Sequence, residues 1–196
     1  IPCNVRSIGD HAFYGCASLT SISIQGSEEY LGFYAFSSCS SLASVAILSS
    51  VASLRDYVFS ECAVLTSVSI PPTVTAIGSY AFFKCPLLTS VTIPATVTTI
   101  GDFAFSECVS LTSVVIPDSV TSIGKSIFNE CSSLASVIIP DSIVLIGDSA
   151  FLKCNSLTSV TICGPITSVG KSTFQGCIAL TTISIPDSVT VIGEGA

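Results

Sequence analysis

Apolar and polar residues alternate along short segments of this chain, and each alternating segment is followed by a longer, differently patterned one. Residues 111–116 form an LxxLxL pattern, in which Val114 and Ile116 alternate with Ser113 and Val115. A period of two predicts a β-strand that turns one face into a core and the other to solvent.

The residues that follow predict a stop, a return to the core and a turn. Pro117 lacks the N–H that ladder pairing requires, so we expect the strand to end there. Val120 and Ile123 are expected to turn inward, as a second short strand on the far side. Gly124 can adopt a positive φ, and we expect it to let the chain turn tightly.

The last segment of the unit is expected to form a short helical turn. Asp102 is placed to act as its N-cap, and Phe105 and Cys108 lie three residues apart, on one face of such a turn. The predicted unit is therefore a strand, a turn, a short strand and a helical turn.

The unit returns every 23 residues without insertion or deletion. The cysteines in register are Cys16, Cys39, Cys62, Cys85, Cys108, Cys131, Cys154 and Cys177. The phenylalanines in register are Phe13, Phe36, Phe59, Phe82, Phe105, Phe128, Phe151 and Phe174. Leucine repeats in the same way from Leu19 to Leu180, and isoleucine from Ile1 to Ile185. Self-similarity of this kind is typical of a solenoid.

We therefore predict a β-rich repeat solenoid of the α/β leucine-rich-repeat type. A period of 23 lies within the leucine-rich-repeat range of about 20 to 29 residues and below the helical-repeat periods of about 33 and above. We expect a right-handed stack of coils, with a parallel concave sheet and the helical turns opposite it. Residues 1–196 are expected to form one domain of about 8.5 repeats. Neither end resembles a polar capping repeat, which predicts a fragment of a longer protein.

Composition narrows the range of partners. The net charge is −7, and the six Lys and Arg residues are scattered. Nucleic-acid binding depends on clusters of basic residues, so we predict no nucleic-acid partner. The longest unbroken apolar runs, such as residues 143–146, are four residues long. A membrane-spanning helix needs about 20, so we expect no membrane insertion by this segment.

Two overlapping segments resemble a known repeat family. They are IPATVTTIGDFAFSECVSLTSVVIP, residues 93–117, and IPDSVTSIGKSIFNECSSLASVIIP, residues 116–140. Both are similar to the BspA-like leucine-rich repeats, with Pro, Val, Ile-Gly, Phe, Cys and Leu all in register, and the likeness extends over the whole chain. The resemblance implies a cell-surface or secreted protein associated with adhesion to host cells or matrix proteins.

A few positions depart from the repeat. Gln25, Leu48 and Cys163 replace the strand-ending proline, and Arg55 replaces the turning glycine. Glu28 stands where other coils have an inward Val or Ile, so we expect that loop to swing outward.

The cysteines do not have the spacing of a metal site. Zinc sites use CxxC-type spacing that converges on one point, whereas a period of 23 gives a row of parallel thiols. Disulfides between stacked neighbours are feasible in distance but need side chains that turn toward each other. We favour free, buried thiols acting as small hydrophobes. Cys3 and Cys163 lie off the row and about 33 Å apart, so they cannot bridge.

The single histidine does not indicate catalysis. His11 lies near Cys3 and Cys16 in the sequence, but Cys16 is expected to be buried and no third group orients the imidazole. His11 also occupies the repeat position that Tyr34 holds one coil later. No GxSxG, P-loop or GxGxxG motif occurs. We predict no enzymatic activity, no metal and no cofactor.

Two surfaces are candidates for a protein ligand. The outward residues of the predicted concave sheet are small and uncharged: Ser67, Ser69, Ser90, Thr92, Ser113, Val115, Ser136 and Ile138, followed by Ser159 and Thr161. The second surface is an aromatic column that begins at His11 and comprises Tyr34, Tyr57, Tyr80 and Phe103, before changing to Ser126, Ser149 and Ser172. The alternatives are that the sheet is an ordinary solvated face and that the aromatic residues only cover the turn.

Two functions remain open from the sequence. One is a non-enzymatic protein-binding scaffold, which the resemblance makes a surface or secreted adhesion protein with a host or matrix partner. The other is a structural spacer or assembly module with no specific ligand, favoured by the monotony of the predicted concave face.

Overall fold

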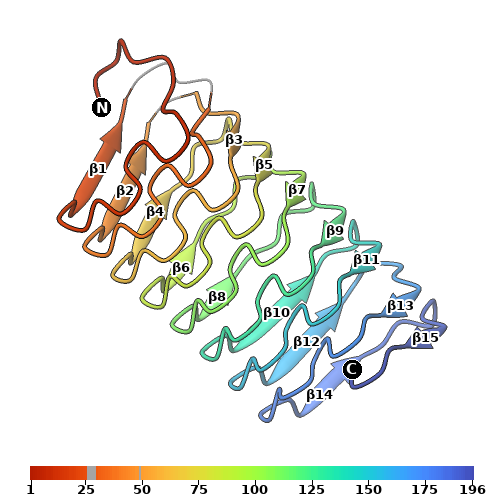
Figure 1. The fold of residues 1–196 in the computed structure, drawn as a ribbon. Helices are drawn as coiled ribbons and strands as arrows, with labels where there is room; N and C mark the ends of the chain where they lie inside the picture. Colours follow the sequence, from red (N-terminus) through yellow and green to blue (C-terminus); the bar gives the residue numbers. More distant parts are fainter. Residues whose placement is uncertain (26–29, 49) are drawn as a thin grey trace.

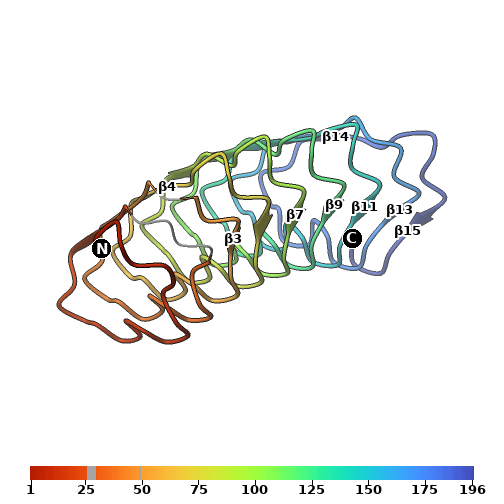
Figure 2. The same ribbon diagram turned by 90° about the horizontal axis from the view of Figure 1, so that it is seen from above.

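The computed structural model describes residues 1–25, 30–48 and 50–196, and through these the chain winds as a stack of coils. The two termini lie at opposite ends of the stack (Figure 1). From above, the coils follow one another along the length of the molecule (Figure 2). The solenoid predicted from the 23-residue period is confirmed.

The LxxLxL segments form parallel strands along one side of the stack (Figure 1). These strands are β1 (Ser21–Ile24), β2 (Ser44–Ile47), β4 (Ser67–Ser69), β6 (Ser90–Val91), β8 (Ser113–Val114), β10 (Ser136–Ile139), β12 (Ser159–Ile162) and β14 (Thr182–Ser184). Paired residues are always one period apart, as for Val45 with Val68 and Val160 with Ile183. We call this side the serine face, after the residues that it turns outward.

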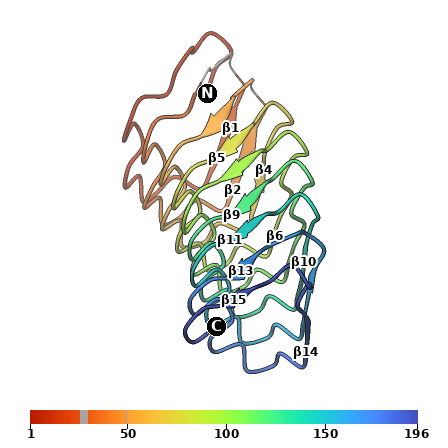
Figure 3. The same ribbon diagram turned by 90° about the vertical axis from the view of Figure 1, so that its right-hand side faces the viewer.

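A second set of parallel strands lies on another side of the stack (Figure 3). It comprises β3 (Ser53–Leu54), β5 (Ala76–Ile77), β7 (Thr99–Ile100), β9 (Ser122–Ile123), β11 (Leu145–Ile146), β13 (Ser168–Val169) and β15 (Val191–Ile192). The short strand expected around Ile123 is therefore confirmed. Single bridges from Ile8 to Leu31 and from Leu31 to Leu54 continue the ladder toward the N-terminus.

Proline controls how far the strands of the serine face extend. Where Leu48 and Cys163 replace it, their amides donate to the carbonyl oxygens of Ile24 and Ile139, at 2.8 and 2.9 Å. The pairs β1–β2 and β10–β12 accordingly match over four residues, whereas β6–β8, followed by prolines, matches over two. The expected outward swing at Glu28 falls outside the described residues.

The predicted helical turns are absent from residues 1–25, 30–48 and 50–196, which contain strands and turns but no helix. Amides in this segment alternate between two partners. Tyr57 and Phe59 donate to the next coil, to carbonyl oxygens of Ser79 and Ala81, both at 2.9 Å. Val58, between them, and Ser60, after them, donate within their own coil, to the carbonyl oxygens of Arg55 at 3.3 Å and Tyr57 at 3.1 Å. A helix would direct all these amides along one coil, so the contacts between coils prevent it.

Positive φ angles make this alternation possible. They occur at Tyr57 (60°) and Glu61 (58°), and at the equivalent positions of other coils. Such angles are unusual for bulky residues, because the Cβ atom approaches the following carbonyl oxygen. The backbone hydrogen bonds on both sides hold these residues in place.

The aspartate expected to cap a helix instead caps the neighbouring coil. The Oδ1 atom of Asp102 accepts from the amide of Lys125, at 2.7 Å. Asp10, Asp56 and Asp148 do the same, at 2.7 to 2.8 Å. Their donors, one coil further on, are Phe33, Ser79 and Lys171. The aspartates recur in every second coil.

The repeated glycine serves a different purpose from the one we predicted. Gly124 does not have a positive φ. A Cβ atom at the equivalent Gly147 would lie 2.7 Å from the amide nitrogen of Lys125 in the preceding coil. Glycine is therefore favoured at these positions because two backbones approach closely, and not because the chain turns in the left-handed region.

The core consists of columns that run the length of the stack. Phe82, Phe105 and Phe128 are fully buried, and their rings stack at centroid distances of 5.3 and 5.7 Å. The cysteine column lies beside them. The thiol of Cys108 donates to the carbonyl oxygen of Phe82, 3.1 Å from Sγ, and the thiol of Cys131 makes the same bond to Phe105.

The cysteines are free, and those from Cys39 to Cys177 in the column are buried, as predicted. Cys16 is exposed, contrary to expectation, because no preceding coil in the structure covers it. Burial raises the pKa of the Cys62 thiol to about 12 and the pKa of the Cys108 thiol well above its usual value. A buried thiolate would lose its hydration, so the neutral thiol is favoured.

Replacing Phe105 tests the stacked core. We expect Phe105→Ala to lower the free energy of unfolding by about 3 to 5 kcal/mol, through lost burial and a cavity. Urea denaturation followed by circular dichroism measures the change. Val115→Ser, at an exposed position just after β8, should stay within about 0.5 kcal/mol. An unchanged midpoint for Phe105→Ala would contradict a buried phenylalanine column.

Thiol counting tests the cysteine column. In the folded protein only Cys3, Cys16 and Cys163 are exposed, so three thiols should react promptly with a coloured disulfide reagent at neutral pH. The remaining seven should react only after denaturation, because they are inaccessible and protonated. Prompt reaction of most of the ten would refute the packing described.

Candidate functional site

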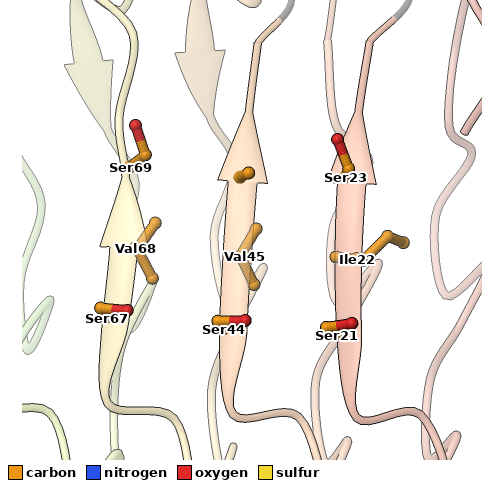
Figure 4. A pocket seen from close by; sticks show the side chains of 9 residues that line it. Ser21, Ile22, Ser23, Ser44, Val45, Ser67, Val68 and Ser69 are labelled. Atoms are coloured by element: carbon orange, nitrogen blue, oxygen red, sulfur yellow. The ribbon is translucent and has the colours of Figure 1, made fainter.

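The outward residues of the serine face form two straight rows, one on each side of an inward row of Val and Ile. In Figure 4, Ser21, Ser44 and Ser67 lie side by side on β1, β2 and β4, and Ser23 and Ser69 lie in the second row. The first row continues through Ser90, Ser113, Ser136, Ser159 and Thr182. The second continues through Thr92, Val115, Ile138, Thr161 and Ser184.

The N-terminal part of this face is a shallow, open depression of about 500 Å³ across β1, β2 and β4 (Figure 4). Its lining consists of Ser, Val, Ala and Ile side chains and contains no titratable group. Such a surface offers hydroxyl donors and acceptors but no nucleophile–base pair and no charge. It can support binding and not acid–base chemistry.

The character of the face changes in the middle of the stack. Val115 is 78% exposed and Ile138 is 64% exposed. Both line an open hollow of about 380 Å³, together with Ser113, Ser136 and Asp118. The two apolar residues among the expected outward positions of the sheet thus lie together in the structure.

Some residues of these surfaces were missed in the sequence. Ser21, Ser23 and Ser44 belong to the rows of the serine face, and the 23-residue register would have identified them. Leu145, in β11, and Val144, just before it, also expose apolar side chains. They lie on the second set of strands, a surface that the sequence did not indicate.

The aromatic column is a continuous stack of parallel rings. Tyr34 and Tyr57 have ring centroids 4.4 Å apart, Tyr57 and Tyr80 4.5 Å, and Tyr80 and Phe103 4.7 Å. The rings are inclined to one another by only 4 to 7°. His11 extends the stack, 4.8 Å from Tyr34.

Stacking changes what this column can offer a ligand. From Tyr34 to Tyr80 each ring is covered on both faces by its neighbours, so only ring edges and hydroxyl groups remain available. Partial burial, with the neighbouring tyrosines Tyr34 and Tyr80, raises the pKa of Tyr57. The column therefore presents ring edges and a line of tyrosine hydroxyl groups in place of flat aromatic anchors.

Arg55, in the glycine column, organises a separate small cluster. Its guanidinium carbon lies 5.3 Å from the ring centroid of Tyr30 and 5.2 Å from that of Phe33. A cation–π contact at an exposed site contributes about 0.5 to 1 kcal/mol. The arginine is thus accommodated by aromatic residues that are themselves departures from the repeat.

The described part of the chain contains no group of three side chains able to hold a metal ion. His11 stacks on Tyr34 and meets Tyr14 edge-on, at 5.6 Å between centroids. Within the same residues, no helix is long and apolar enough to cross a membrane.

The chain matches the family model described as the BspA type leucine-rich repeat region, over residues 1–98 and 75–196. These matches span the whole sequence, and the chain belongs to this family of leucine-rich-repeat proteins. Proteins built from these repeats are typically non-enzymatic scaffolds and interaction modules. No curated protein matches the chain.

Several solved structures are similar to this chain. A leucine-rich repeat protein from Bacteroides ovatus is 31% identical, with a TM-score of 0.66, over 98% of this chain and 67% of that one. The leucine-rich repeat protein of T. pallidum is 27% identical, with a TM-score of 0.70, over 92% and 76%. A leucine-rich cell surface protein from Faecalibacterium prausnitzii is 30% identical, with a TM-score of 0.56, over 100% and 68%.

Substitutions in the aromatic column should reveal how much its stacking contributes to stability. Tyr57→Ser removes two ring contacts and should lower the free energy of unfolding by about 1 to 3 kcal/mol, since each pair contributes about 0.5 to 1.5 kcal/mol. Phe103→Ser removes one aromatic contact and should cost about half as much. Serine holds the same positive φ at Ser126, so the backbone tolerates it. Equal losses in the two variants, measured by urea denaturation, would contradict this interpretation.

Proposed function

We propose that this protein is a non-enzymatic scaffold that binds a protein partner on its serine face, with Val115 and Ile138 at the centre of the contact. The observation that carries the proposal is the exposure of these two side chains, 78% and 64%, in a row that is otherwise mostly Ser and Thr. Exposed apolar patches on a rigid frame are typical of interaction sites.

The geometry of the face favours a protein surface over a small molecule. The hollow beside Val115 is open, and its two exposed apolar side chains, Val115 and Ile138, are bordered by the hydroxyls of Ser113 and Ser136. An apolar centre with a polar rim is the usual arrangement of a protein–protein contact. The strands are fixed by ladder hydrogen bonds and core packing, so little conformational entropy is lost on binding.

The cellular setting proposed for this function is the cell surface or the medium outside it, with host or matrix proteins as partners. Support comes from the family and from the F. prausnitzii relative, which is a cell surface protein. The pneumococcal antigen PcpA, 19% identical, supports the fold alone.

The test is a double substitution that restores the repeat. Val115→Ser with Ile138→Ser returns the row to the residue found at Ser69 and Ser184. Binding to a panel of purified matrix proteins and cultured cells should weaken at least about tenfold, a loss of about 1.4 kcal/mol. Val144→Thr, which changes an exposed apolar residue on the other set of strands, should leave the affinity unchanged.

The same panel separates the remaining alternatives. Failure of the unmodified protein to bind any member would favour a structural spacer or assembly module. Binding that survives the serine-face substitutions but is lost when Tyr34, Tyr57 and Tyr80 are changed to Ser would move the site to the edges of the aromatic column.

A further inference from the structure

A second group of apolar residues lies at the turn edge and does not line the hollow beside Val115. Pro86 and Val109 occupy a column of varied residues, whose other members are Ala17, Ser40, Ala63, Ser132, Asn155 and Ile178. Both residues line an open depression of about 480 Å³, with Ala63 one coil earlier. The serines in other coils show that the fold does not require apolar side chains here, so their exposure needs another explanation.

The apolar area extends beyond the depression itself. Val109 is 38% exposed, and Leu87, next to Pro86, is 45% exposed. The column of Leu87 contains serine at Ser41 and Ser110. Over this short stretch of coils the two adjacent columns are apolar together, at Ala63, Pro86 and Val109 in one and at Val64 and Leu87 in the other.

A line of charged side chains borders this depression. Glu61, Lys84 and Glu107 occupy the same turn position in three consecutive coils, all with positive φ, and all three line the depression. Lys84 Nζ lies 4.0 Å from Glu107 Oε2. Glu61 accepts a hydrogen bond from the hydroxyl of Ser38, at 3.2 Å. Two carboxylates beside one ammonium group give the border a net negative charge.

We propose that this depression docks a short segment of a protein partner that carries basic side chains beside apolar ones. The apolar residues of the segment would cover Pro86 and Val109, and its basic residues would lie against Glu61 and Glu107. Charge complementarity selects this partner, because both the local border and the whole chain, at −7, are negative. An acidic segment would meet repulsion on both counts.

The site is independent of the proposed contact on the serine face. Neither Val115 nor Ile138 lines the turn-edge depression, and neither Pro86 nor Val109 lines the hollow beside Val115. The two sites therefore succeed or fail separately.

Labelled peptides of about 12 residues with alternating sequence serve as probes. One alternates leucine with lysine, a second leucine with glutamate, and a third serine with lysine. Fluorescence anisotropy should show the leucine–lysine peptide binding at least about tenfold more tightly than either of the others. Equal binding of the leucine–glutamate peptide would overturn the charge argument, and equal binding of the serine–lysine peptide would overturn the apolar contact.

Serine substitutions in the depression locate the site. Pro86→Ser with Val109→Ser should weaken the binding of the leucine–lysine peptide about tenfold. Val115→Ser with Ile138→Ser, on the serine face, should leave the affinity for this peptide unchanged. The new amide at position 86 has a ready partner, since the amide of Ser132 donates to the carbonyl oxygen of Glu130 at 2.8 Å in the equivalent turn. Thermal denaturation checks the fold, and Val109→Ser alone serves if the double variant is destabilised. Unchanged peptide affinity in a folded variant would refute the proposal.

Charge substitutions provide a readout that moves in two directions. Glu61→Gln should weaken the binding of the leucine–lysine peptide about threefold, and Lys84→Gln should strengthen its binding by a similar factor, the size of effect expected for exposed charge pairs. Both effects should diminish in high salt. Shifts of the same sign in both variants would show that the charged border does not contact the peptide.

Discussion

Each coil of this protein is held in place by the coils before and after it, through hydrogen bonds and apolar contacts one period apart. Strand residues pair with those 23 positions away, turn amides donate to the next coil, and buried thiols donate to a phenylalanine carbonyl one coil back. These contacts require every coil to have the same length. The absence of insertions in the sequence is thus a consequence of how the backbone groups are satisfied.

The same constraint explains which parts of the fold could be predicted. The period places Phe82, Phe105 and Phe128 in one column, and alternation identifies the strand that includes Val114. Both follow from spacing alone. The prediction of a helical turn was wrong, because residue spacing does not tell whether a backbone amide such as that of Tyr57 donates within its own coil or to the next coil.

Two residue roles were misassigned for related reasons. Asp102 is a good N-cap residue, but the amide that it satisfies belongs to Lys125, one coil away. A glycine such as Gly124 can serve either a positive φ or a close approach of two backbones, and the sequence alone does not distinguish these two roles. Each error concerns a contact between coils that has no local sequence pattern. Within the candidate site, Val115 and Ile138 were found because they interrupt a regular row. At the separate turn-edge depression, the line formed by Glu61, Lys84 and Glu107 was missed, because these residues appear isolated until the coils are stacked.

Because the aspartates occur in every second coil, the repeating unit of these side chains is a pair of coils, whereas the backbone repeats with every coil. Asp10, Asp56, Asp102 and Asp148 belong to every second coil, and each is bonded to an amide of the coil that lacks one. Loss of a single coil would keep the strands in register but place two carboxylates in adjacent coils, about 4.8 Å apart, where like charges repel. Loss or duplication of a coil pair preserves both the strands and the carboxylate spacing. Growth and shortening of such a stack are therefore least disruptive when they proceed two coils at a time.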